Sequence, residues 1–327
     1  MWDAVAKRIR DNNRFVLTTH INPDGDAIGS EIALAAFLEE LGKEVVIVNS
    51  SPTPLNSIFM APPERILVYP DGYTPSILDN TDQIIILDVS TWGHLGPFGD
   101  AIKESSKPRM CIDHHQGTGD GFADVLAIDT SAAAAGVLVY ELIKYMGGDI
   151  TPRIADAVYA TVITDTGTFR FSNTDTRVFK IAAELSGRGV DPFTIHRHMF
   201  SKTRGAVRLL GAVLRTMEMT DDGKIAWLHV TEDMFRESDA TYDDSDGLID
   251  VVRAIESVEL CMFFKEIDGG NVKVSLRSNG SVDVFELAKR YGGGGHRMAA
   301  GMTINGSMDQ AIEKVVDNCK TGELPRV

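Results

Sequence analysis

The chain has 327 residues, enough for two domains that each bury a hydrophobic core. Its 43% hydrophobic and 24% charged residues are typical of a folded globular protein and exclude a disordered or fibrous one. The formal net charge of −15 disfavours a binder of long nucleic acid, which needs a broad basic surface, but it allows small anions held through bound divalent cations.

Membrane and disulfide signals are both missing from the sequence. No apolar run approaches the ~18 residues of a membrane helix, and residues 1–13 mix charged and apolar side chains, unlike a secretory signal. We therefore expect a cytoplasmic protein with no membrane partner. Three widely separated cysteines, Cys111, Cys261 and Cys319, predict buried or free thiols rather than disulfides or a thiolate zinc site.

The first half of the chain alternates short apolar runs with helical stretches. Residues 15–20 predict a buried strand, and residues 27–43 predict a helix because large apolar side chains recur at spacings of three and four. Each later apolar run ends in polar residues, which is typical of parallel strands connected by helices. We therefore expect an α/β domain whose parallel sheet carries helices on both faces. Its further strands are expected over 44–50, 83–90 and 109–116.

The middle of the chain is expected to be helical, over 131–148, 152–167, 175–187 and 190–219. We interpret Ala132 to Ala135 as structural, because small side chains permit close packing. The last of the four stretches is more basic than its surroundings and is expected to connect two domains. Its apolar stripe fits either a homodimer contact or packing between domains. The stripe consists of Val207, Leu210, Val213 and Leu214.

The last third of the chain is rich in predicted β-strands, which are interleaved with helices. This texture predicts a second, smaller α+β domain. The strands are expected over 224–231, 258–267 and 271–278, and the helices over 245–257, 283–292 and 307–320. The predicted boundaries are a catalytic domain over 1–188, a helical connector over 189–219 and a second domain over 220–327.

Aspartates and histidines gather at the C-terminal ends of the predicted strands and near the end of one helix. Because strand ends form one edge of an open α/β sheet, side chains from four segments would meet there. Singly, each aspartate has an ordinary explanation as a helix cap or turn residue. Together, the carboxylates would repel one another unless cations lay between them. The residues are His20, Asp24, Asp26, Asp88, Asp113, His114, His115 and Asp165.

The ligand types predict which metal ions would bind. Carboxylate oxygens with fewer imidazoles and no thiolate favour Mn²⁺, with Mg²⁺ or Co²⁺ as substitutes. Six of these side chains are more ligands than one ion needs, so we expect two ions. Two ions about 3.5–4 Å apart would share a hydroxide that attacks phosphorus in line.

Four segments of the chain resemble the motifs of the DHH phosphoesterase superfamily. Residues 274–301, VSLRSNGSVDVFELAKRYGGGGHRMAAG, also resemble its associated C-terminal domain. The likeness runs nearly end to end, and it is greatest to the NrnA-like group of bifunctional oligoribonucleases and bisphosphoadenosine (pAp) phosphatases. The four motifs are HINPDGDAIGS (20–30), ILDVS (86–90), CIDHHQ (111–116) and TDTGTFRFSNTD (164–175).

This resemblance implies a role for each side chain at the sheet edge. Asp88 would bridge the two metal ions, and Asp113 would orient a ligand imidazole. His115 would stabilise the charge of the scissile phosphate or help the leaving oxygen depart. The implied ligand sets are His20, Asp24 and Asp88 for one ion, and Asp26, Asp88, His114 and Asp165 for the other.

A second cluster lies in the glycine-rich run of residues 292–301. A bare glycine run usually indicates a flexible loop, but glycines directly before His296 allow backbone N–H groups to approach an anion. Arg277 adds donors suited to phosphate, and the resemblance implies that Arg277 and His296 grip a terminal phosphate across an interdomain cleft. Arg297 either joins them or is a surface charge. The predicted phosphate-binding residues are Arg277, Gly293, Gly294, Gly295, His296 and Arg297.

A phosphate clamp at a fixed distance from the metal ions would favour very short oligomers. Arg170 and Asn173 would also line the cleft, although Phe169 and Phe171 on either side of Arg170 are equally typical of a half-buried strand.

The chain departs from the superfamily pattern at three places. The segment at Gly117–Gly119 lacks an asparagine that relatives often carry. Val137 stands where many have a glutamate, and His94 stands where an arginine is frequent. These differences leave the substrate preference open.

The leading hypothesis is a manganese-dependent phosphodiesterase and phosphomonoesterase. Its partners would be short RNA oligonucleotides and small phosphorylated nucleotides such as pAp, not long nucleic acid. Hydrolysis of linear or cyclic dinucleotides is the enzymatic alternative. A nucleotide-binding protein without turnover is the non-enzymatic alternative; it would lack a metal ligand or His115, and neither is missing from this sequence.

Overall fold

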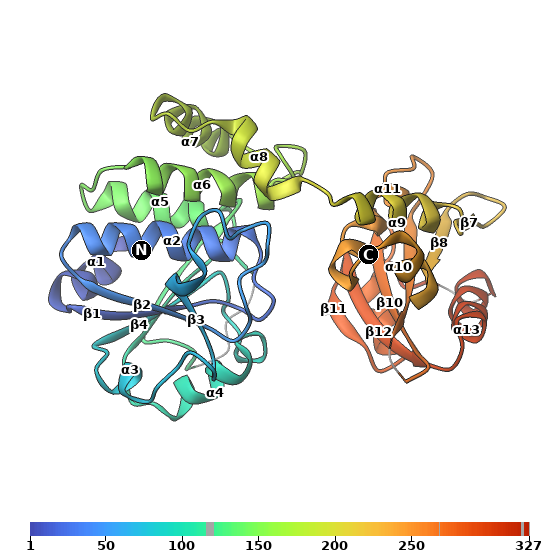
Figure 1. Ribbon diagram of the computed structural model, residues 1–327, viewed down its shortest axis with the longest axis horizontal. Helices are drawn as coiled ribbons and strands as arrows, with labels where there is room; N and C mark the ends of the chain where they lie inside the picture. The colour runs from blue at the N-terminus through green and yellow to red at the C-terminus, as the bar shows by residue number, and fades with distance from the viewer. Residues whose placement is uncertain (116–120, 268, 322–323, 327) are drawn as a thin grey trace. The chain divides into compact units, whose positions relative to one another are not determined.

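The chain folds into two compact units, Met1–Ser201 (unit 1) and Lys202–Val327 (unit 2), in a computed structural model (Figure 1). Each unit contains a six-stranded sheet, and hydrophobic cores lie on both faces of each sheet. Within the part of the chain that the structure describes, no helix combines the length and the hydropathy that crossing a bilayer requires. The described residues are 1–115, 121–267, 269–321 and 324–326.

The sheet of unit 1 is parallel throughout, as the alternation of strands and helices predicts. Its central strand, β1, pairs with β2 on one side and β4 on the other. The segments that follow β1, β4 and β5 therefore leave the sheet at the same edge. The strands lie in the spatial order β3 (Ile66–Val68), β2 (Glu44–Asn49), β1 (Arg14–Thr18), β4 (Gln83–Leu87), β5 (Arg109–Asp113) and β6 (Val125–Ile128).

Successive residues of these strands pack into different cores, as the two-residue period of a strand requires. Leu17 and Ile85 belong to the larger core, whereas Val16 and Ile84 belong to the smaller core on the opposite face. The smaller core is covered by α3 (Ser76–Asp79) and α4 (Gly96–Glu104), with Trp92 of η2 (Trp92–His94) packed against it, and η1 (Pro63–Arg65) precedes β3. The larger core is covered by α1 (Trp2–Asp11), α2 (Gly25–Glu40), α5 (Ala135–Tyr145), α6 (Pro152–Asp165), α7 (Thr176–Gly187) and α8 (Pro192–Phe200) (Figure 1).

Helix α2 is buried from Gly25 to Leu38 because α5 and α6 pack on it as well as the sheet. Gly29 allows the backbone of α6 to approach closely. A Cβ atom at this position would lie 2.7 Å from the carbonyl oxygen of Ala157, closer than any side chain permits. The first ligand-bearing turn is therefore anchored to a helix that is fixed on all sides.

The sheet of unit 2 is mixed. β8 and β9 are parallel, and all other neighbours are antiparallel, which agrees with the predicted α+β class. One face is covered by α12 (Val284–Lys289) and α13 (Met308–Thr321). The other is covered by α9 (Arg204–Leu214), α10 (Glu232–Ser238) and α11 (Leu248–Arg253), with η3 (Tyr242–Ser245) beside them. The strands lie in the order β11 (Gly294–His296), β12 (Ala299–Asn305), β10 (Asn271–Ser278), β9 (Leu260–Ile267), β8 (Ile225–Val230) and β7 (Glu218–Met219).

The segment expected to connect the domains contributes to both units, α8 to unit 1 and α9 to unit 2. Most of its apolar stripe is used inside unit 2. Val213 is fully buried in the core on the helical face, and Leu210 and Leu214 pack against that core. Val207 is 58% exposed.

Candidate metal centre

The turn between β1 and α2 carries the first ligand-type side chains. Asp24 is the N-cap of α2, and its Oδ1 accepts hydrogen bonds from the backbone N–H groups of Asp26 (2.9 Å) and Ala27 (3.1 Å). The helix-cap explanation is therefore correct for Asp24, but both capping bonds use the same oxygen. In the same turn, His20 donates through Nδ1 to the carbonyl oxygen of Ile21 (2.9 Å), and its Nε2 faces Asp88.

Asp88 lies between two histidines directly after β4. Its Oδ2 is 3.4 Å from Nε2 of His20, and its Oδ1 is 3.3 Å from Nε2 of His114. The residue has φ of +58°, a left-handed conformation that aspartate tolerates better than most residues and that is common at functional sites. It is 3% exposed, and its Oδ1 has no hydrogen-bond partner among the described residues. A buried carboxylate oxygen without a partner costs free energy unless something binds it.

The end of β5 orders two imidazoles through one carboxylate. Asp113 Oδ1 accepts hydrogen bonds from the backbone N–H groups of His114 (2.7 Å) and His115 (3.1 Å), and from Nδ1 of His115 (2.8 Å). His115 is about half exposed, whereas Asp113 is fully buried. Asp113 therefore fixes the ring of His115 and leaves its Nε2 pointing away from the carboxylate.

Nε2 of His114 is the point on which three carboxylates converge. Besides Asp88, Asp26 Oδ2 lies 3.6 Å away and Asp165 Oδ2 lies 3.3 Å away. None of these approaches has hydrogen-bond geometry, so Nε2 has no hydrogen-bond partner within the described chain. Nδ1 of the same ring donates to the carbonyl oxygen of Ala132 (3.2 Å). The ring is thus held by Nδ1 and presents Nε2 to the acidic cluster.

Asp165 ends α6 and is followed by a left-handed turn. Gly167, Thr168 and Phe169 have φ of +55°, +59° and +63°, which is a strained conformation for the two residues that have side chains. The hydroxyl of Thr166 accepts a hydrogen bond from the N–H of Phe169 (3.0 Å). The alternative of a half-buried strand over residues 169–173 is therefore wrong, because the chain turns there instead of extending.

Besides the group of Asp88, Asp113, His114 and His115, two further groups of described side chains have the geometry of metal sites. In each, one ligand atom per residue lies within 4.8 Å of the others. The donors are carboxylate oxygens and imidazole nitrogens, and a buried oxygen and a buried nitrogen in them lack partners within the described chain. This donor set fits divalent cations of the Mn²⁺ and Mg²⁺ type. The first group is His20, Asp24 and Asp88, and the second is Asp26, His114 and Asp165. We call them the first and the second ligand set.

The pKa values at this centre reflect crowded negative charge. Burial, together with the neighbouring Asp88, raises the pKa of Asp26 to about 8 and also raises that of Asp24. Burial lowers the pKa of His114, but the three carboxylates of Asp88, Asp26 and Asp165 raise it by more. The resulting pKa is about 10. Bound protons thus compensate the clustered carboxylates, and divalent cations would displace those protons on binding.

Asp88 and Asp113 behave in the opposite way. Burial raises the pKa of Asp88, but His114 and His20 lower it more, so its pKa lies below the usual value. Burial also raises the pKa of Asp113, but the hydrogen bonds that Asp113 accepts, led by that from His115, lower it more. The pKa of Asp113 therefore also lies below its usual value. The hydrogen bond that His115 donates to Asp113 raises the pKa of His115, against the effect of burial. Asp88 and Asp113 are therefore the carboxylates that stay ionised, each beside an imidazole.

In unit 2, the sheet register places two predicted phosphate-binding positions on either side of β12. Ala299 pairs with Arg277 of β10 and with His296 of β11. Two strand spacings separate the two positions, about 10 Å. Arg277 donates from Nη1 to the carbonyl oxygen of Leu276 (3.1 Å), which leaves other N–H donors of its guanidinium for a ligand. The side chain of His296 lies outside the described part of the structure.

The glycine run forms a helix stop and an edge strand rather than one loop. A Cβ atom on Gly293 would lie 2.3 Å from the carbonyl oxygen of Gly301, and one on Gly295 would lie 2.6 Å from that of Ala299. Gly294 has no such neighbour within 4 Å. Packing thus explains two of the glycines. Because β11 is an edge strand, alternate backbone N–H groups point away from β12, where an anion could bind them.

Arg297 is engaged with another side chain of unit 2. Its Nε lies 3.5 Å from Oδ2 of Asp283, whose Oδ1 caps α12, and the Arg297 side chain is 58% exposed. This pairing supports the surface-charge alternative for Arg297.

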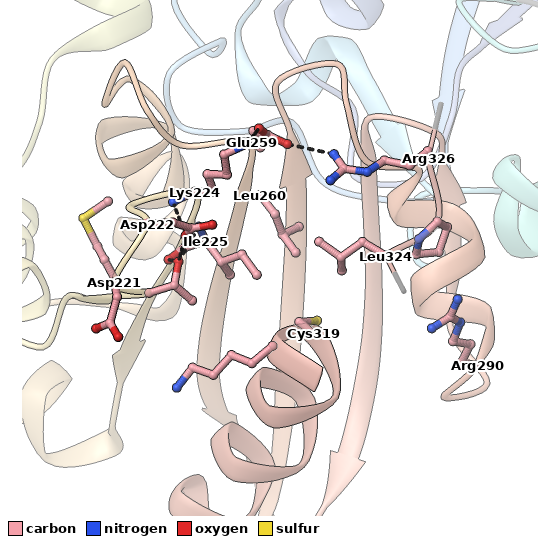
Figure 2. Close-up of a pocket in the computed structure, with 14 residues that line it drawn as sticks. Asp221, Asp222, Lys224, Ile225, Glu259, Leu260, Arg290, Cys319, Leu324 and Arg326 are labelled. Carbon is pink, nitrogen blue, oxygen red and sulfur yellow. Dashed lines mark hydrogen bonds and ion pairs between the residues drawn. The ribbon is translucent and has the colours of Figure 1, made fainter. Parts of the chain in front are cut away.

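The larger cleft of unit 2 lies away from these residues. It has a volume of about 1120 Å³, and none of the predicted phosphate-binding residues lines it (Figure 2). Three of its charged side chains pair with each other: Glu259 accepts hydrogen bonds from Lys224 (2.7 Å) and Arg326 (2.8 Å). Gly293 instead borders a smaller hollow of about 440 Å³, together with Lys273 and Tyr291.

Sequence reasoning missed a buried polar network behind the first ligand set. Glu31, inside the apolar run of α2, is fully buried and accepts a hydrogen bond from Nδ2 of Asn49 (2.8 Å). Oδ1 of Asn49 accepts from the N–H of Thr19 (3.3 Å), and the Thr19 hydroxyl donates to the carbonyl oxygen of Leu87 (2.8 Å). The network joins the residues that precede His20 and Asp88. A glutamate in an otherwise apolar helix was the available signal.

The departures from the superfamily pattern have different surroundings. His94 is exposed, and its Nδ1 lies 2.8 Å from the hydroxyl of Thr91, while its carbonyl oxygen accepts from the N–H of Ile21 (2.7 Å). Val137 is fully buried in the larger core of unit 1. The segment at Gly117–Gly119 lies outside the described residues. The three cysteines are free and buried, as predicted.

Comparison with known proteins identifies the family. Residues 14–162 match the N-terminal domain of the DHH family, and residues 223–321 match the DHHA1 domain. The bifunctional oligoribonuclease and PAP phosphatase NrnA of Thermus thermophilus is 34% identical, over 92% of this chain and 87% of its own length. The chain belongs to the DHH family. The resemblance carried by the four sequence motifs is thereby confirmed, as is the prediction of a phosphoesterase.

Two further similarities extend over nearly the whole chain. NrnA of Bacillus subtilis is 28% identical, with 97% of each chain covered. The crystal structure of an exopolyphosphatase-related protein from Bacteroides fragilis is 29% identical and has a TM-score of 0.91, over 97% of this chain and 94% of that one. The DHH family fold therefore extends through both units.

Proposed function

We propose that this DHH-family protein hydrolyses short oligoribonucleotides to mononucleotides and releases phosphate from pAp. The observation that carries the proposal is the pair of ligand sets beside Asp88: the first contains Asp88, and His114 of the second has its Nε2 3.3 Å from Oδ1 of Asp88. Support for the substrates comes from NrnA of Thermus thermophilus and of Bacillus subtilis, both named as oligoribonuclease and PAP phosphatase.

The first ligand set would hold one divalent cation, and the second set would hold another, with Asp88 between them. When bound, such cations supply Lewis-acid polarisation of a phosphoryl group and a water nucleophile at neutral pH. We assign Mn²⁺ to both sites because imidazoles accompany the carboxylates, with Mg²⁺ or Co²⁺ as substitutes. The carboxylates position the cations, and the histidines complete each set through nitrogens already turned toward the cluster.

We assign His115 the transfer of a proton to the leaving oxygen. Its Nδ1 is held by Asp113 at 2.8 Å, and this contact raises the pKa of the imidazole. The half-exposed ring therefore keeps a proton that Nε2 can donate to substrate. Asp113 positions His115 and stays ionised. Because the nucleophile would be water, no covalent intermediate is needed.

We assign binding of a substrate phosphate to Arg277, His296 and the backbone of Gly293–Gly295 in unit 2. The guanidinium donors of Arg277 that have no partner among the described residues, and the edge position of β11, support this assignment. The net charge of −15 disfavours long nucleic acid, whose backbone requires many cationic contacts, and it favours substrates with few phosphates.

The test is hydrolysis of a substrate panel in Mn²⁺ by the full chain and by Asp88→Asn. The panel contains 5′-phosphorylated RNA from dimer to decamer, pAp, linear pApA, cyclic di-AMP and pyrophosphate. Rapid cleavage of the shortest RNAs and phosphate release from pAp, both lost in Asp88→Asn, are the expected result. Strong preference for cyclic di-AMP would replace this function with the dinucleotide alternative. Metal binding without turnover of any substrate would indicate the nucleotide-binding alternative.

A further inference from the structure

Residues 132–136, the end of the alanine-rich segment before α5 and its first turn, contact the second ligand set through their backbone. The carbonyl oxygen of Ala132 accepts from Nδ1 of His114 (3.2 Å). The N–H groups of Ala135 and Gly136 donate to Oδ2 (2.6 Å) and Oδ1 (2.9 Å) of Asp26. The carboxylate of Asp26 therefore supplies the cap that α5 lacks from its own N-cap residue, Ala134.

The third member of the set, Asp165, is joined to the same segment through Asn173. The Nδ2 group of Asn173 donates to the carbonyl oxygen of Ala133 (3.1 Å) and to that of Asp165 (3.0 Å). One amide group thus bridges the segment that holds Asp26 and His114 and the residue at the end of α6. It also closes the left-handed turn over Gly167–Phe169, whose conformation needs support from neighbouring contacts.

From these contacts we infer that residues 132–136 are a backbone template for the second ligand set, and that Asn173 is the positioning residue that fixes Asp165 to it. The inference rests on the proposed function, because it concerns how the second cation is held. Asn173 binds neither cation nor substrate in this scheme. It acts by keeping the carboxylate of Asp165 at the separation from His114 that the structure shows, 3.3 Å.

The first ligand set does not depend on this template. Among the described residues, no hydrogen bond joins residues 132–136 or Asn173 to His20, Asp24 or Asp88. That set is supported instead by the Thr19–Asn49–Glu31 network. Loss of Asn173 should therefore weaken one of two cation-binding events and leave the other unchanged. A general loss of stability would weaken both.

Asn173→Ala removes the bridge, and Asn173→Asp keeps its size while replacing the donor with a carboxylate that faces two carbonyl oxygens. Groups that orient metal ligands typically change affinity by about 10–100-fold. We expect Mn²⁺ binding at one site to weaken by about tenfold in Asn173→Ala and by at least as much in Asn173→Asp. If Asn173 only filled space, Asn173→Asp would bind like the parent chain.

The experiment is calorimetric titration of the metal-free full chain with Mn²⁺, with thermal unfolding followed by circular dichroism. Asn12→Ala is the matched control, because Nδ2 of Asn12 also donates to a backbone carbonyl oxygen, that of Arg8 (2.8 Å), before β1 begins. The expected result is two ions on the parent chain and on Asn12→Ala, with one of the two weakened in both Asn173 variants. If Asn173→Ala does not fold, Asn173→Asp carries the test.

The failures of the two proposals are distinguishable. Fewer than two ions on the parent chain would overturn the two-cation function itself. Two ions on the parent chain with unchanged affinities in the Asn173 variants would overturn only the template. Equal weakening of both ions, or weakening in Asn12→Ala, would also overturn the template, because it would show a loss of stability and not a loss of positioning.

Discussion

The two units gather functional side chains in different ways. In unit 1, Asp88 and Asp113 come together because β4 and β5 are parallel and end at one edge. In unit 2, Arg277 and His296 are related by pairing with a common residue, Ala299, across antiparallel strands. The arrangement in unit 1 follows from the direction of the strands alone. The arrangement in unit 2 depends also on which residues of neighbouring strands pair with each other. Changes in unit 1 should therefore affect cation binding, and changes in unit 2 should affect substrate binding or the local fold.

Asp88→Asn is expected to have the largest effect. Asparagine tolerates the φ of +58° at this position, so the fold should be kept. The charge that faces both His20 and His114 is lost. We expect kcat/KM for pAp and for a 5′-phosphorylated RNA dimer to fall by about a thousandfold or more, with weaker binding of both Mn²⁺ ions. Steady-state kinetics and calorimetry measure these effects, and turnover close to that of the parent would rule out a bridging role.

Arg277→Ala tests the substrate-binding role that we assign to unit 2. Hydrogen bonds to a charged group contribute about 1.5–3 kcal/mol, so we expect kcat/KM for short RNA to fall by about 10–100-fold, mainly through KM. Mn²⁺ affinity should not change, because both ligand sets lie in unit 1. Arg277→Lys is the matched variant and should recover only part of the loss, since an ammonium lacks the planar donor fork. A loss of Mn²⁺ binding in either variant would contradict this division of roles.

The difference between the units also explains what the sequence could predict. β1 and β4 are apolar runs that end before His20 and Asp88, and β5 is an apolar run that ends at Asp113, so both the parallel sheet and its functional edge were predictable. In unit 2, β8, β9 and β10 were equally visible. β11 was not, because a glycine-rich strand has no hydrophobic alternation. β12 was also missed, although its buried residues Ala300, Met302 and Ile304 alternate with less buried ones.

Three features of the site had no sequence signal strong enough to use. The backbone of Ala132–Gly136 holds ligands, but alanine side chains say nothing about which carbonyl or N–H group is used. The left-handed turn over Gly167–Phe169 is fixed by tertiary contacts, and its alternating aromatic residues favoured a strand. Glu31 was hidden in an apolar helical pattern, where a single polar residue is usually solvent-exposed.

The glycine run offers a test of the register in unit 2. Gly295 has φ of +139°, and a Cβ atom there would lie 2.6 Å from the carbonyl oxygen of Ala299. Gly295→Ala should therefore destabilise unit 2 by about 1–3 kcal/mol. Gly294→Ala is the matched control, because no described atom apart from its chain neighbours lies within 4 Å of its Cβ position, and it should change stability by less than about 1 kcal/mol. Urea denaturation compares them, followed by tryptophan fluorescence of the full chain in a Trp2→Phe and Trp92→Phe background, where Trp227 of β8 is the remaining tryptophan. Equal effects would mean that the strand pairing is wrong.

Glu31 predicts a smaller, pH-dependent effect in unit 1. Burial raises its pKa to about 8 from the ordinary value of 4.5, although the hydrogen bond from Asn49 opposes the rise. Between these pH values the folded state holds a proton that the unfolded state has released. Stability therefore falls as pH rises from about 5 to about 8, by at most about 1.4 kcal/mol per pH unit.

Glu31→Gln removes this titration and keeps an oxygen for Asn49. As the pH rises from about 5 to about 8, we expect the free energy of unfolding of the metal-free parent chain to fall relative to that of Glu31→Gln. Above that range, the difference between the two free energies should stay constant. Urea denaturation of both chains in a chelator, at pH 5, 6, 7 and 8, measures the difference. Other groups with raised pKa, such as Asp26, titrate in both chains and cancel from it. A difference that does not vary with pH would show that Glu31 is ionised in the folded protein, so that the network behind His20 and Asp88 carries a negative charge.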